Sequence, residues 1–269
     1  MIGLGVAGNF TGHLEQAGEA EDFANIKVQD EKAPKGLFPF YSNSKTGKFI
    51  EIYPLSSSKI SRPSKGESLQ IEPEVALICE ISYNNGQVID LKPKKFTAFN
   101  DCTIRKPGAK KISEKKNWGK NSKGISLTHI DIDRFSRGGI MDTYRLACYL
   151  KRDNELHEYG IDSPLIGYSY FYEKLLNWII FKMNTQNDEG PLESIAMHLK
   201  ESGYPVNAVI SIGSTRYTEF GESTFLDVGD ESFIIIYDSK LYTSRSVEKL
   251  VQDSNYTVNG LSILHQIVV

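Results

Sequence analysis

The stretch QIEPEVALICEISYNNGQVIDL, residues 70–91, decides the fold. Two arms rich in apolar and β-branched residues flank Asn85 and Gly86. This pair is typical of a type I′ turn, because both central residues of that turn need a positive φ. The stretch therefore predicts two antiparallel strands joined by a tight hairpin turn.

A pair of acidic residues, Glu72 and Glu74, lies at the start of this hairpin. Residues two apart in a strand point to the same face, about 7 Å apart along the backbone. Two carboxylates on one face repel each other unless a positive charge lies between them, and ligands that are all oxygen favour Mg²⁺, Mn²⁺ or Ca²⁺ over Zn²⁺. Pro73 cannot donate to a sheet ladder, which suggests a sheet edge or a bulge. The alternative is an ordinary pair of carboxylates that faces solvent.

Short strands also dominate the rest of the chain, so we predict an α+β, mostly β fold in a single domain over residues 1–269. A second hairpin is expected to turn near Asp153 and Asn154. Apolar spacing predicts a helix over 169–184, and Pro191 and Gly203 mark the start and end of another. Further strands are expected in these ranges: 47–55, 96–104, 206–213, 224–240 and 262–269.

Composition excludes several classes of protein. The chain has 269 residues, a net charge of −3 and 40% hydrophobic residues, which are values of a globular protein rather than of a disordered or strongly nucleic-acid-binding one. No apolar run approaches the roughly 20 residues that a membrane-spanning helix needs. The three scattered cysteines predict no disulfide framework, and we expect a cytoplasmic protein.

Glycines at the start of the chain, Gly3, Gly5 and Gly8, form the G-x-G-x-x-G pattern of dinucleotide-binding turns. Such a turn follows a buried strand and belongs to a βαβ unit. Only two residues precede Gly3, and residues 38–91 show strands and turns with no crossover helix. We therefore expect a short first strand whose glycines permit close packing and a bend.

A third acidic residue, Asp101, lies at the end of a predicted strand in FNDCTIR, residues 99–105, and NWGKNSKG then places Lys120 in a loop. With the E-x-E pair, these segments resemble the fumarylacetoacetate hydrolase family. There the metal is held by an E-x-E pair and the Asp of an ND-x-[ST]-x-R segment, and a lysine follows in a tryptophan-containing stretch. The resemblance implies an FAH-like mixed β-sandwich roll with a few peripheral helices. It also implies Mg²⁺ or Mn²⁺, with Ca²⁺ as a further option, on Glu72, Glu74 and Asp101.

The opening segment VAGNFTGHLEQ, residues 6–16, is similar to the segment that begins the catalytic domain in this family. The likeness implies that His13 is an acid–base residue and that Asn9 and Phe10 line the substrate site. Gln16 stands where the family has a glutamate that polarises the histidine.

A second segment, VISIGSTRY, lies where the family has a turn that binds a substrate carboxylate. The resemblance therefore implies substrate-binding roles for Gly213 and Ser214.

The resemblance implies an enzyme that acts on a small α-keto or enol carboxylate, such as an acylpyruvate or oxaloacetate. The reaction is C–C bond hydrolysis, decarboxylation or keto–enol isomerisation, and the first is disfavoured because Gln16 cannot carry charge. His13 would move protons and Lys120 would add positive charge beside the developing oxyanion. Arg105 would either pair with a ligand carboxylate or grip a substrate carboxylate.

Two alternatives remain. The first is a relative that has lost catalysis and kept the metal. The second is a nucleic-acid or anion-binding protein that uses residues 105–123, which hold eight Lys or Arg against one Glu, with Trp118 available for stacking. A basic run this short is more often a solvated loop, so nucleic acid is disfavoured. The resemblance also implies a homodimer and mobile lid segments at 14–36 and 105–123.

Overall fold

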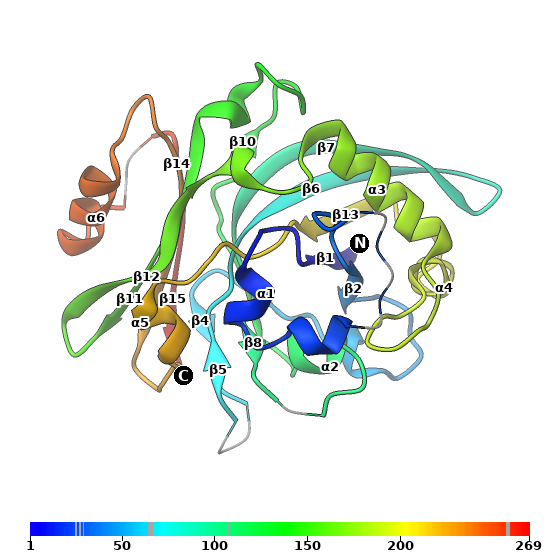
Figure 1. Ribbon diagram of the computed structural model, residues 1–269, viewed down its shortest axis with the longest axis horizontal. Helices are drawn as coiled ribbons and strands as arrows, with labels where there is room; N and C mark the ends of the chain where they lie inside the picture. Colours follow the sequence, from blue (N-terminus) through cyan, green and yellow to red (C-terminus); the bar gives the residue numbers. More distant parts are fainter. Residues whose placement is uncertain (25, 27, 29, 64–66, 107, 257–258) are drawn as a thin grey trace.

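The structure is a computed structural model that describes residues 1–24, 26, 28, 30–63, 67–106, 108–256 and 259–269. Strands outnumber helices in these residues, and most belong to two sheets with short helices around them (Figure 1). The fold is α+β and mostly β, as the sequence predicts. The predicted lid segments 14–36 and 105–123 include residues 25, 27, 29 and 107, which lie outside the described part.

The larger sheet contains eight strands among the described residues. The parallel neighbours are β1 with β13 and β3 with β9, and the other pairs are antiparallel. Strand β10 (Ile130–Asp131) pairs with β7 beside the main path. The spatial order is β2 (Gly36–Tyr41), β1 (Ile2–Ala7), β13 (Asn207–Ser211), β6 (Pro73–Asn84), β7 (Gln87–Asn100), β9 (Lys123–Ile125) and β3 (Leu55–Ser56).

The smaller sheet lies at the left of Figure 1 and contains five strands in the described part of the chain. Its first two strands form the second predicted hairpin, and both turn residues, Asp153 and Asn154, have a positive φ (52° and 66°). A separate two-stranded ladder joins β5 (Leu69–Gln70) and β8 (Thr103–Ile104). The order of the smaller sheet is β12 (Glu155–Pro164), β11 (Tyr144–Arg152), β14 (Glu231–Asp238), β15 (Leu261–Val268) and β4 (Lys59–Ile60).

The hairpin of β6 and β7 is the longest pairing in the larger sheet. Asn85 and Gly86 at its tip have φ values of 49° and 78°, as the predicted type I′ turn requires. The ladder continues from this tip to Pro73, which lies opposite Asn100. The open end of the hairpin is therefore fixed by backbone pairing over the length of both strands.

The glycines of the first strand serve packing rather than phosphate binding. A Cβ atom on Gly3 would lie 2.2 Å from the ring of Phe40, and one on Gly5 would lie 2.1 Å from the ring of Phe38. Strand β1 is buried over its whole length between β2 and β13. Gly8 follows the strand with a φ of 74°, which turns the chain out of the sheet.

Helices α3 (Tyr172–Thr185), α4 (Ile195–Glu201) and α6 (Ser244–Gln252) flank the two sheets. In Figure 1, α3 and α4 flank the larger sheet at the right and α6 lies beside the smaller sheet. None of the helices in the described residues combines the length and the apolar character that a membrane crossing requires. The α-helices are α1 (His13–Gln16), α2 (Ser113–Lys116), α3 (Tyr172–Thr185), α4 (Ile195–Glu201), α5 (Glu219–Ser223) and α6 (Ser244–Gln252), and the 3₁₀ turns are η1 (Ala20–Phe23), η2 (Phe49–Glu51), η3 (Ile140–Thr143) and η4 (Leu165–Gly167).

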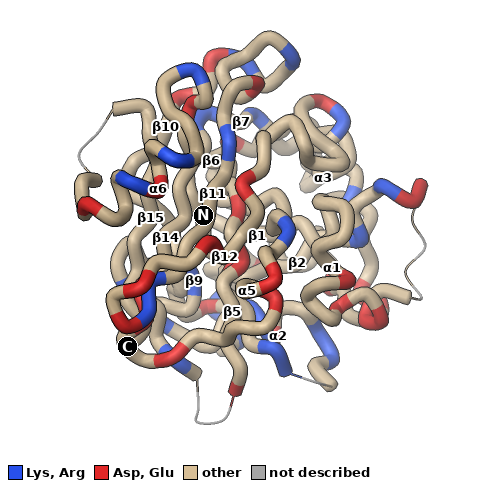
Figure 2. Tube along the Cα trace, turned by 60° about the vertical axis from the view of Figure 1, so that its left-hand side comes forward, with Lys and Arg blue, Asp and Glu red and all other residues tan. Residues whose placement is uncertain are grey.

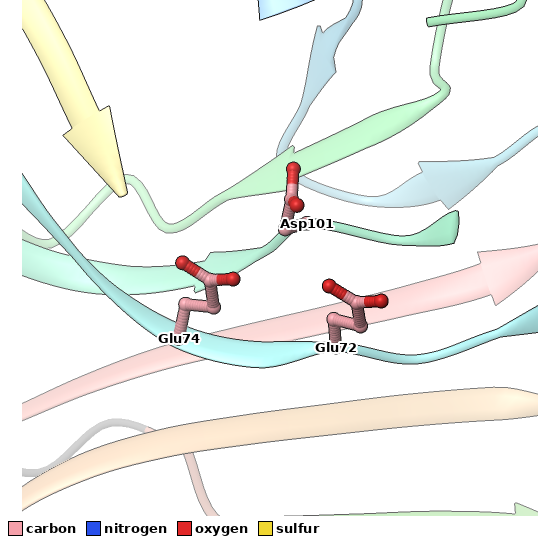
Figure 3. Close-up of side chains that lie close together, drawn as sticks. All are labelled: Glu72, Glu74 and Asp101. Atoms are coloured by element: carbon pink, nitrogen blue, oxygen red, sulfur yellow. The ribbon is translucent and has the colours of Figure 1, made fainter. Parts of the chain in front are cut away.

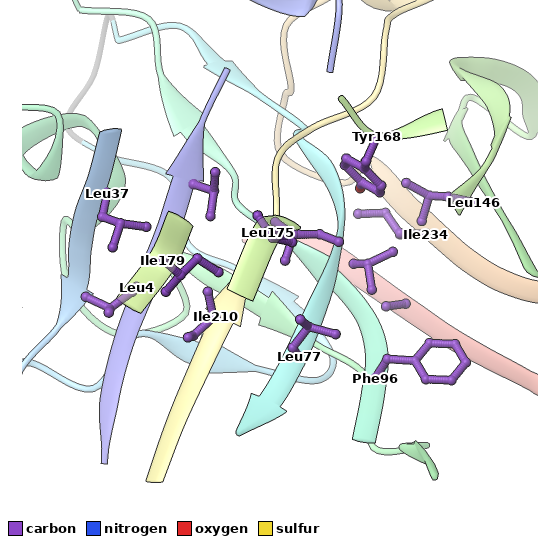
Figure 4. Packing of buried hydrophobic residues seen from close by; sticks show 14 of the residues in the cluster. Leu4, Leu37, Leu77, Phe96, Leu146, Tyr168, Leu175, Ile179, Ile210 and Ile234 are labelled. Atoms are coloured by element: carbon purple, nitrogen blue, oxygen red, sulfur yellow. The ribbon is translucent and has the colours of Figure 1, made fainter. Parts of the chain in front are cut away.

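The main hydrophobic core joins the two sheets and α3. Figure 4 shows Leu4 and Ile210, from the neighbouring strands β1 and β13, near Ile179 of α3. Leu146 of β11 and Ile234 of β14 extend the same cluster into the smaller sheet.

Three local predictions are wrong. Of residues 224–240, predicted as one strand, only Glu231–Asp238 form a strand, because a turn in which the Asp227 N–H donates to the Asp230 side chain precedes it. Residues 47–55 do not form one strand, because the Glu51 side chain accepts hydrogen bonds from Ser44 and the Gly47 N–H and holds a turn that contains η2. Helix α4 begins at Ile195 rather than at Pro191, because the Ser194 side chain accepts the Met197 N–H and caps the helix there.

Candidate metal centre and active site

Three carboxylates meet at the open end of the β6–β7 hairpin. Glu72 immediately precedes β6, Glu74 is the second residue of β6, and Asp101 immediately follows β7. The Asp101 N–H donates to the Glu72 carbonyl oxygen at 3.0 Å, which continues the ladder one step beyond the strands. All three residues are at least 97% buried, and one carboxylate oxygen from each lies within 4.8 Å of the others (Figure 3). The solvent-facing alternative for the E-x-E pair is therefore excluded.

Glu72 and Asp101 each contact two cationic side chains. Glu72 lies 2.6 Å from the Nζ of Lys116 and 2.9 Å from Arg105, and Asp101 lies 2.6 Å from Lys116 and 3.0 Å from the Nζ of Lys123. Burial alone would raise the pKa of Glu72, but the charges of Lys116 and Arg105 outweigh it and hold that pKa below its usual range. The pKa of Lys116 is correspondingly raised, because its two carboxylate partners outweigh its burial.

Glu74 has a different environment. It accepts the backbone N–H of Gly213 at 2.9 Å, and no Lys or Arg nitrogen of the described residues lies within 4.0 Å of it. Burial, reinforced by the charges of Asp101 and Glu72, raises the pKa of Glu74 well above its usual range. This carboxylate is the one that most lacks a positive partner.

The lysines of the site are not the one that the sequence analysis selects. Lys120 is exposed, whereas Lys116 and Lys123 are buried against the carboxylates. Lys116 is the last residue of α2, and Lys123 begins β9 beside β7. The loop between Trp118 and β9 carries Lys120 outward, so the lysine that the sequence predicts for the site does not lie at the carboxylates.

Arg105 is held entirely by protein groups. Its guanidinium binds Glu72 and Glu19 at 2.9 and 2.8 Å and also donates to Gln70 and to the Tyr217 hydroxyl. Of the two roles predicted for Arg105, the structure shows the pairing with Glu72, a candidate ligand carboxylate. Most of its N–H groups are occupied, so no pair of them remains free to bind a substrate carboxylate.

His13 begins α1 and points into the same cavity as the carboxylates. Gly8 and Gly12, both with a positive φ, make the turn that directs it there. Its Nδ1 is buried and has no hydrogen-bond partner among the described residues. Burial lowers the pKa of His13 to about 4, so the imidazole is neutral at pH 7.

The other predicted residues of the opening segment lie beside the site. The Asn9 side chain is fully buried and bonds only backbone groups, the N–H and carbonyl of Tyr170 and the carbonyl of Ile212. Phe10 packs edge-on against Tyr168 and lines a separate surface hollow. Asn9 is thus a structural residue in this arrangement, and neither side chain lines the cavity of the carboxylates.

The predicted carboxylate-binding turn lies at the wall of the cavity. Gly213 has a φ of 113° and directs its N–H to Glu74, and its carbonyl accepts the Tyr168 hydroxyl. Ser214 lines the cavity, and its hydroxyl donates to the Thr215 carbonyl. Of the two, Ser214 is the residue that faces the carboxylates.

The Gln16 side chain bonds groups other than His13. Its amide is occupied by the backbone of Tyr217, as donor and as acceptor, and by Glu222. Glu19, which the sequence analysis does not assign, is buried in the cavity wall and accepts Arg105 and Lys115. No carboxylate among the described residues hydrogen-bonds His13.

The cavity enclosed by these groups has a volume of about 20 Å³. One water needs about 10–15 Å³ by this measure, so the cavity accepts an ion or a water, whereas even a small α-keto acid is several times larger. Leu14, Phe23, Phe38 and Ile112 close it on the side of α1 and α2.

The basic segment 105–123 is directed inward rather than toward a polyanion. Arg105, Lys115, Lys116 and Lys123 pair with buried acidic groups, and Lys111 pairs with Asp188. In Figure 2, basic segments alternate with acidic ones over the visible face. The nucleic-acid alternative loses its main support, because most of the charges that it needs are already paired.

A family model described as "Family of unknown function (DUF5718)" matches residues 19–268. The chain belongs to this family. No curated protein matches the sequence significantly.

Solved structures with a similar fold include three proteins whose names describe enzymes. A protein of Oleispira antarctica named for fumarylacetoacetate isomerase/hydrolase aligns over 100% of this chain and 93% of its own, with a TM-score of 0.57 and 12% identity. A 2-keto-3-deoxy-D-arabinonate dehydratase complexed with magnesium and 2,5-dioxopentanoate aligns over 99% and 72%, with a TM-score of 0.53 and 12% identity. The 5-carboxymethyl-2-hydroxymuconate delta-isomerase of Mycobacterium smegmatis aligns over 100% and 78%, with a TM-score of 0.51 and 13% identity. The prediction of an FAH-like fold is confirmed.

Proposed function

We propose that this protein is a divalent-metal-dependent enzyme that acts on a small α-keto or enol carboxylate. The observation that carries the proposal is the convergence of Glu72, Glu74 and Asp101 in one buried cavity, beside an unpartnered nitrogen of His13. The dehydratase that shares this fold, complexed with magnesium and 2,5-dioxopentanoate, supports the choice of ion and of substrate class.

The three carboxylates fit a hard divalent ion. Two oxygens around one ion are separated by at most twice the metal–oxygen distance, about 4.2 Å for Mg²⁺ and about 5 Å for Ca²⁺. The oxygens here lie within 4.8 Å of one another, which is inside this limit for Ca²⁺ and about 0.6 Å beyond it for Mg²⁺, so the smaller ion would require the carboxylates to move closer together. Glu74, which lacks a cationic partner, would gain the most from such an ion.

When bound, the ion supplies Lewis-acid polarisation of a substrate carbonyl. His13 is neutral at pH 7 and can take a proton from, or return it to, the adjacent carbon or oxygen of the substrate. Arg105 and Lys123 hold the carboxylates of Glu72 and Asp101 in position. Ser214 lies at the cavity wall, where its hydroxyl can orient a substrate carboxylate.

Decarboxylation or keto–enol isomerisation fits the site better than C–C bond hydrolysis. Hydrolysis needs a base strong enough to activate water, and His13 has no carboxylate partner in the described residues to strengthen it, since Gln16 bonds the backbone of Tyr217. The homodimer and the cytoplasmic location remain predictions.

The decisive experiment compares Mn²⁺ binding in wild-type protein and in Glu74→Gln. This variant keeps the acceptor for the Gly213 N–H, whereas removal of Glu72 would also take one carboxylate partner from Arg105 and one from Lys116. Glu80→Gln, at an exposed position on the same strand, is the matched control. We expect Glu74→Gln to weaken Mn²⁺ binding at least tenfold and the control to leave it unchanged. Equal affinity in all three proteins would eliminate this site.

A second candidate function is metal binding without catalysis. The volume of the cavity, about 20 Å³, and the occupied amide of Gln16 favour it. Turnover assays with oxaloacetate and a panel of acylpyruvates, with Mn²⁺ and with EDTA, separate the two. Metal-dependent turnover of any of these compounds identifies the enzyme, and tight Mn²⁺ binding without turnover identifies the non-catalytic relative.

A further inference from the structure

We propose that Lys116 is a tethered cation that neutralises two of the three metal ligands, so that a divalent ion has to displace its ammonium group in order to bind. The inference rests on the metal site of the proposed function, and it concerns how that site is loaded. In this view, Lys116 competes with the metal and so lowers its affinity, and it offsets the repulsion between Glu72 and Asp101 when no metal is bound.

The contacts of Lys116 define its position. Its Nζ lies 2.6 Å from Glu72 Oε2, 2.6 Å from Asp101 Oδ2 and 2.6 Å from Thr103 Oγ1. Two of its three N–H donors form hydrogen bonds, to Glu72 and Thr103, and the contact with Asp101 is an ion pair. A divalent ion bound to the same two carboxylates would compete for the same oxygens and would lie close to a like charge.

The second lysine of the site shows why Lys116 is the displaceable one. Lys123 contacts Asp101 but also donates to the backbone carbonyls of Asp101 and Cys102, at 2.7 and 2.5 Å. It belongs to β9, which is paired with β7. Lys116 instead ends the four-residue helix α2, and none of its three partners is a backbone group. Its release breaks no sheet or backbone pairing.

Displacement of Lys116 would also change the room available for a substrate. The Lys116 side chain is one of the walls of the 20 Å³ cavity, together with Ile112 from the same segment. Withdrawal of this side chain enlarges the cavity. Metal loading and space for a substrate are therefore coupled through one residue.

The test is a Mn²⁺ titration, by calorimetry, of wild-type protein, Lys116→Met and Lys110→Met. Lys116→Met keeps an unbranched side chain that matches the lysine up to Cε and removes the ammonium group. Lys110 is an exposed lysine of the same segment, so Lys110→Met removes the same charge away from the carboxylates. We expect Lys116→Met to bind Mn²⁺ at least tenfold more tightly than wild-type protein and Lys110→Met to stay within twofold of it.

Equal or weaker binding by Lys116→Met, with a measurable wild-type affinity, overturns this inference and leaves the metal site intact. Absence of Mn²⁺ binding in both proteins overturns the proposed function and the inference together. A crystal structure of wild-type protein with Mn²⁺ supplies a test that does not depend on the folding of a variant. Lys116 should then have left Glu72 and Asp101, and an ion bound while the ammonium group still bridges both carboxylates would overturn the inference.

Discussion

The two sides of the site are built in different ways. Its floor is the open end of the β6–β7 hairpin, where the long backbone ladder between the two strands supports Glu72, Glu74 and Asp101. Its cover consists of α1 and α2, helices of four residues each, which bring His13 and Lys116 over the carboxylates. Helices this short are not stable alone, so the cover depends on packing. That packing is a small separate cluster of Ala7, Leu14, Phe23, Phe38, Ile112 and Leu192.

This difference separates the carboxylates, which must stay in place, from the part of the cavity wall that must move if a substrate is to enter. Repelling carboxylates need a rigid support, and the sheet provides it. The cavity of about 20 Å³ is too small for a keto acid, so a substrate requires part of its wall to move. We expect the cover, with its few apolar contacts, to be the part that opens at a low free energy.

Loss of a cation from the floor should have the largest effect. Lys123→Met leaves Asp101 buried with one cationic partner fewer and leaves the carbonyls of Asp101 and Cys102 without their donor. Removal of one partner of a buried ion pair typically destabilises a protein by about 3–5 kcal/mol. Urea unfolding of Lys123→Met should show a loss of this order, and the exposed Lys120→Met should stay within about 0.5 kcal/mol of wild-type protein. Similar stability for both variants would mean that Lys123 does not form the buried ion pair with Asp101 that supports the floor.

Hydrogen exchange should distinguish the floor from the cover directly. The amides of β6 are protected by pairing with β7 and β13, whereas Asn117 at the end of α2 donates to Ser113 across a single turn. We expect Asn117 to exchange at least about 100-fold faster than the central amides of β6, which corresponds to about 2.7 kcal/mol of opening free energy. Equal protection would show that the cover and the floor open as one unit.

The same contrast explains which parts of the site could be predicted from the sequence. Strand periodicity places Glu72 and Glu74 on one face, and a carboxylate at a strand end places Asp101 near them, because hairpin pairing is encoded locally by Asn85 and Gly86. The cover has no such periodicity. Helix α2 is one turn long, and its segment holds eight Lys or Arg, so nothing local distinguishes the buried Lys116 and Lys123 from the exposed Lys120.

The partners of Asn9 and Gln16 were beyond prediction for a related reason. Both side chains bind backbone groups that lie more than 150 residues away in the chain, so their roles depend on tertiary packing. A motif similarity identifies such positions without showing what they bond.

His13 should make stability depend on pH in a defined window. Burial lowers its pKa from 6.5 to about 4 in the folded state, so between these values the unfolded chain binds a proton that the folded protein does not. The free energy of unfolding should therefore fall as the pH is lowered from 6.5, by at most about 1.4 kcal/mol per pH unit from this group. Urea unfolding at pH 7, 6 and 5 should show a shallower slope for His13→Gln than for wild-type protein.

Glu74 and Asp101 line the same cavity as His13 and have raised pKa values because they are buried, so their protonation favours the folded protein as the pH falls and opposes the effect of His13. Both proteins share these two groups, so the difference between the two slopes reports on His13. Glu19 and Glu72 have their pKa values lowered in the folded protein from 4.5, so their contributions are lost at a lower pH, and Arg105 and Lys116 stay protonated. Equal slopes for both proteins between pH 6.5 and 5 would mean that His13 is solvated rather than enclosed by the cover.

The smallest effect on the free energy of unfolding is expected for Glu74→Gln, and the direction of this effect tests the site. Burial and the charges of Asp101 and Glu72 raise the pKa of Glu74 in the folded protein, so above about pH 4.5 its charge favours the unfolded state. Glu74→Gln removes that charge and keeps the acceptor for Gly213, so in EDTA at pH 7 it should stabilise the protein by about 1 kcal/mol. The gain should shrink as the pH falls toward 4.5.

With saturating Mn²⁺ the order of stability should reverse, because the wild-type protein alone gains the binding energy of the full ligand set. A variant that is less stable than wild-type protein in EDTA would show that Glu74 already has a cationic partner, and the floor would then lack the unpaired carboxylate that makes it a metal site.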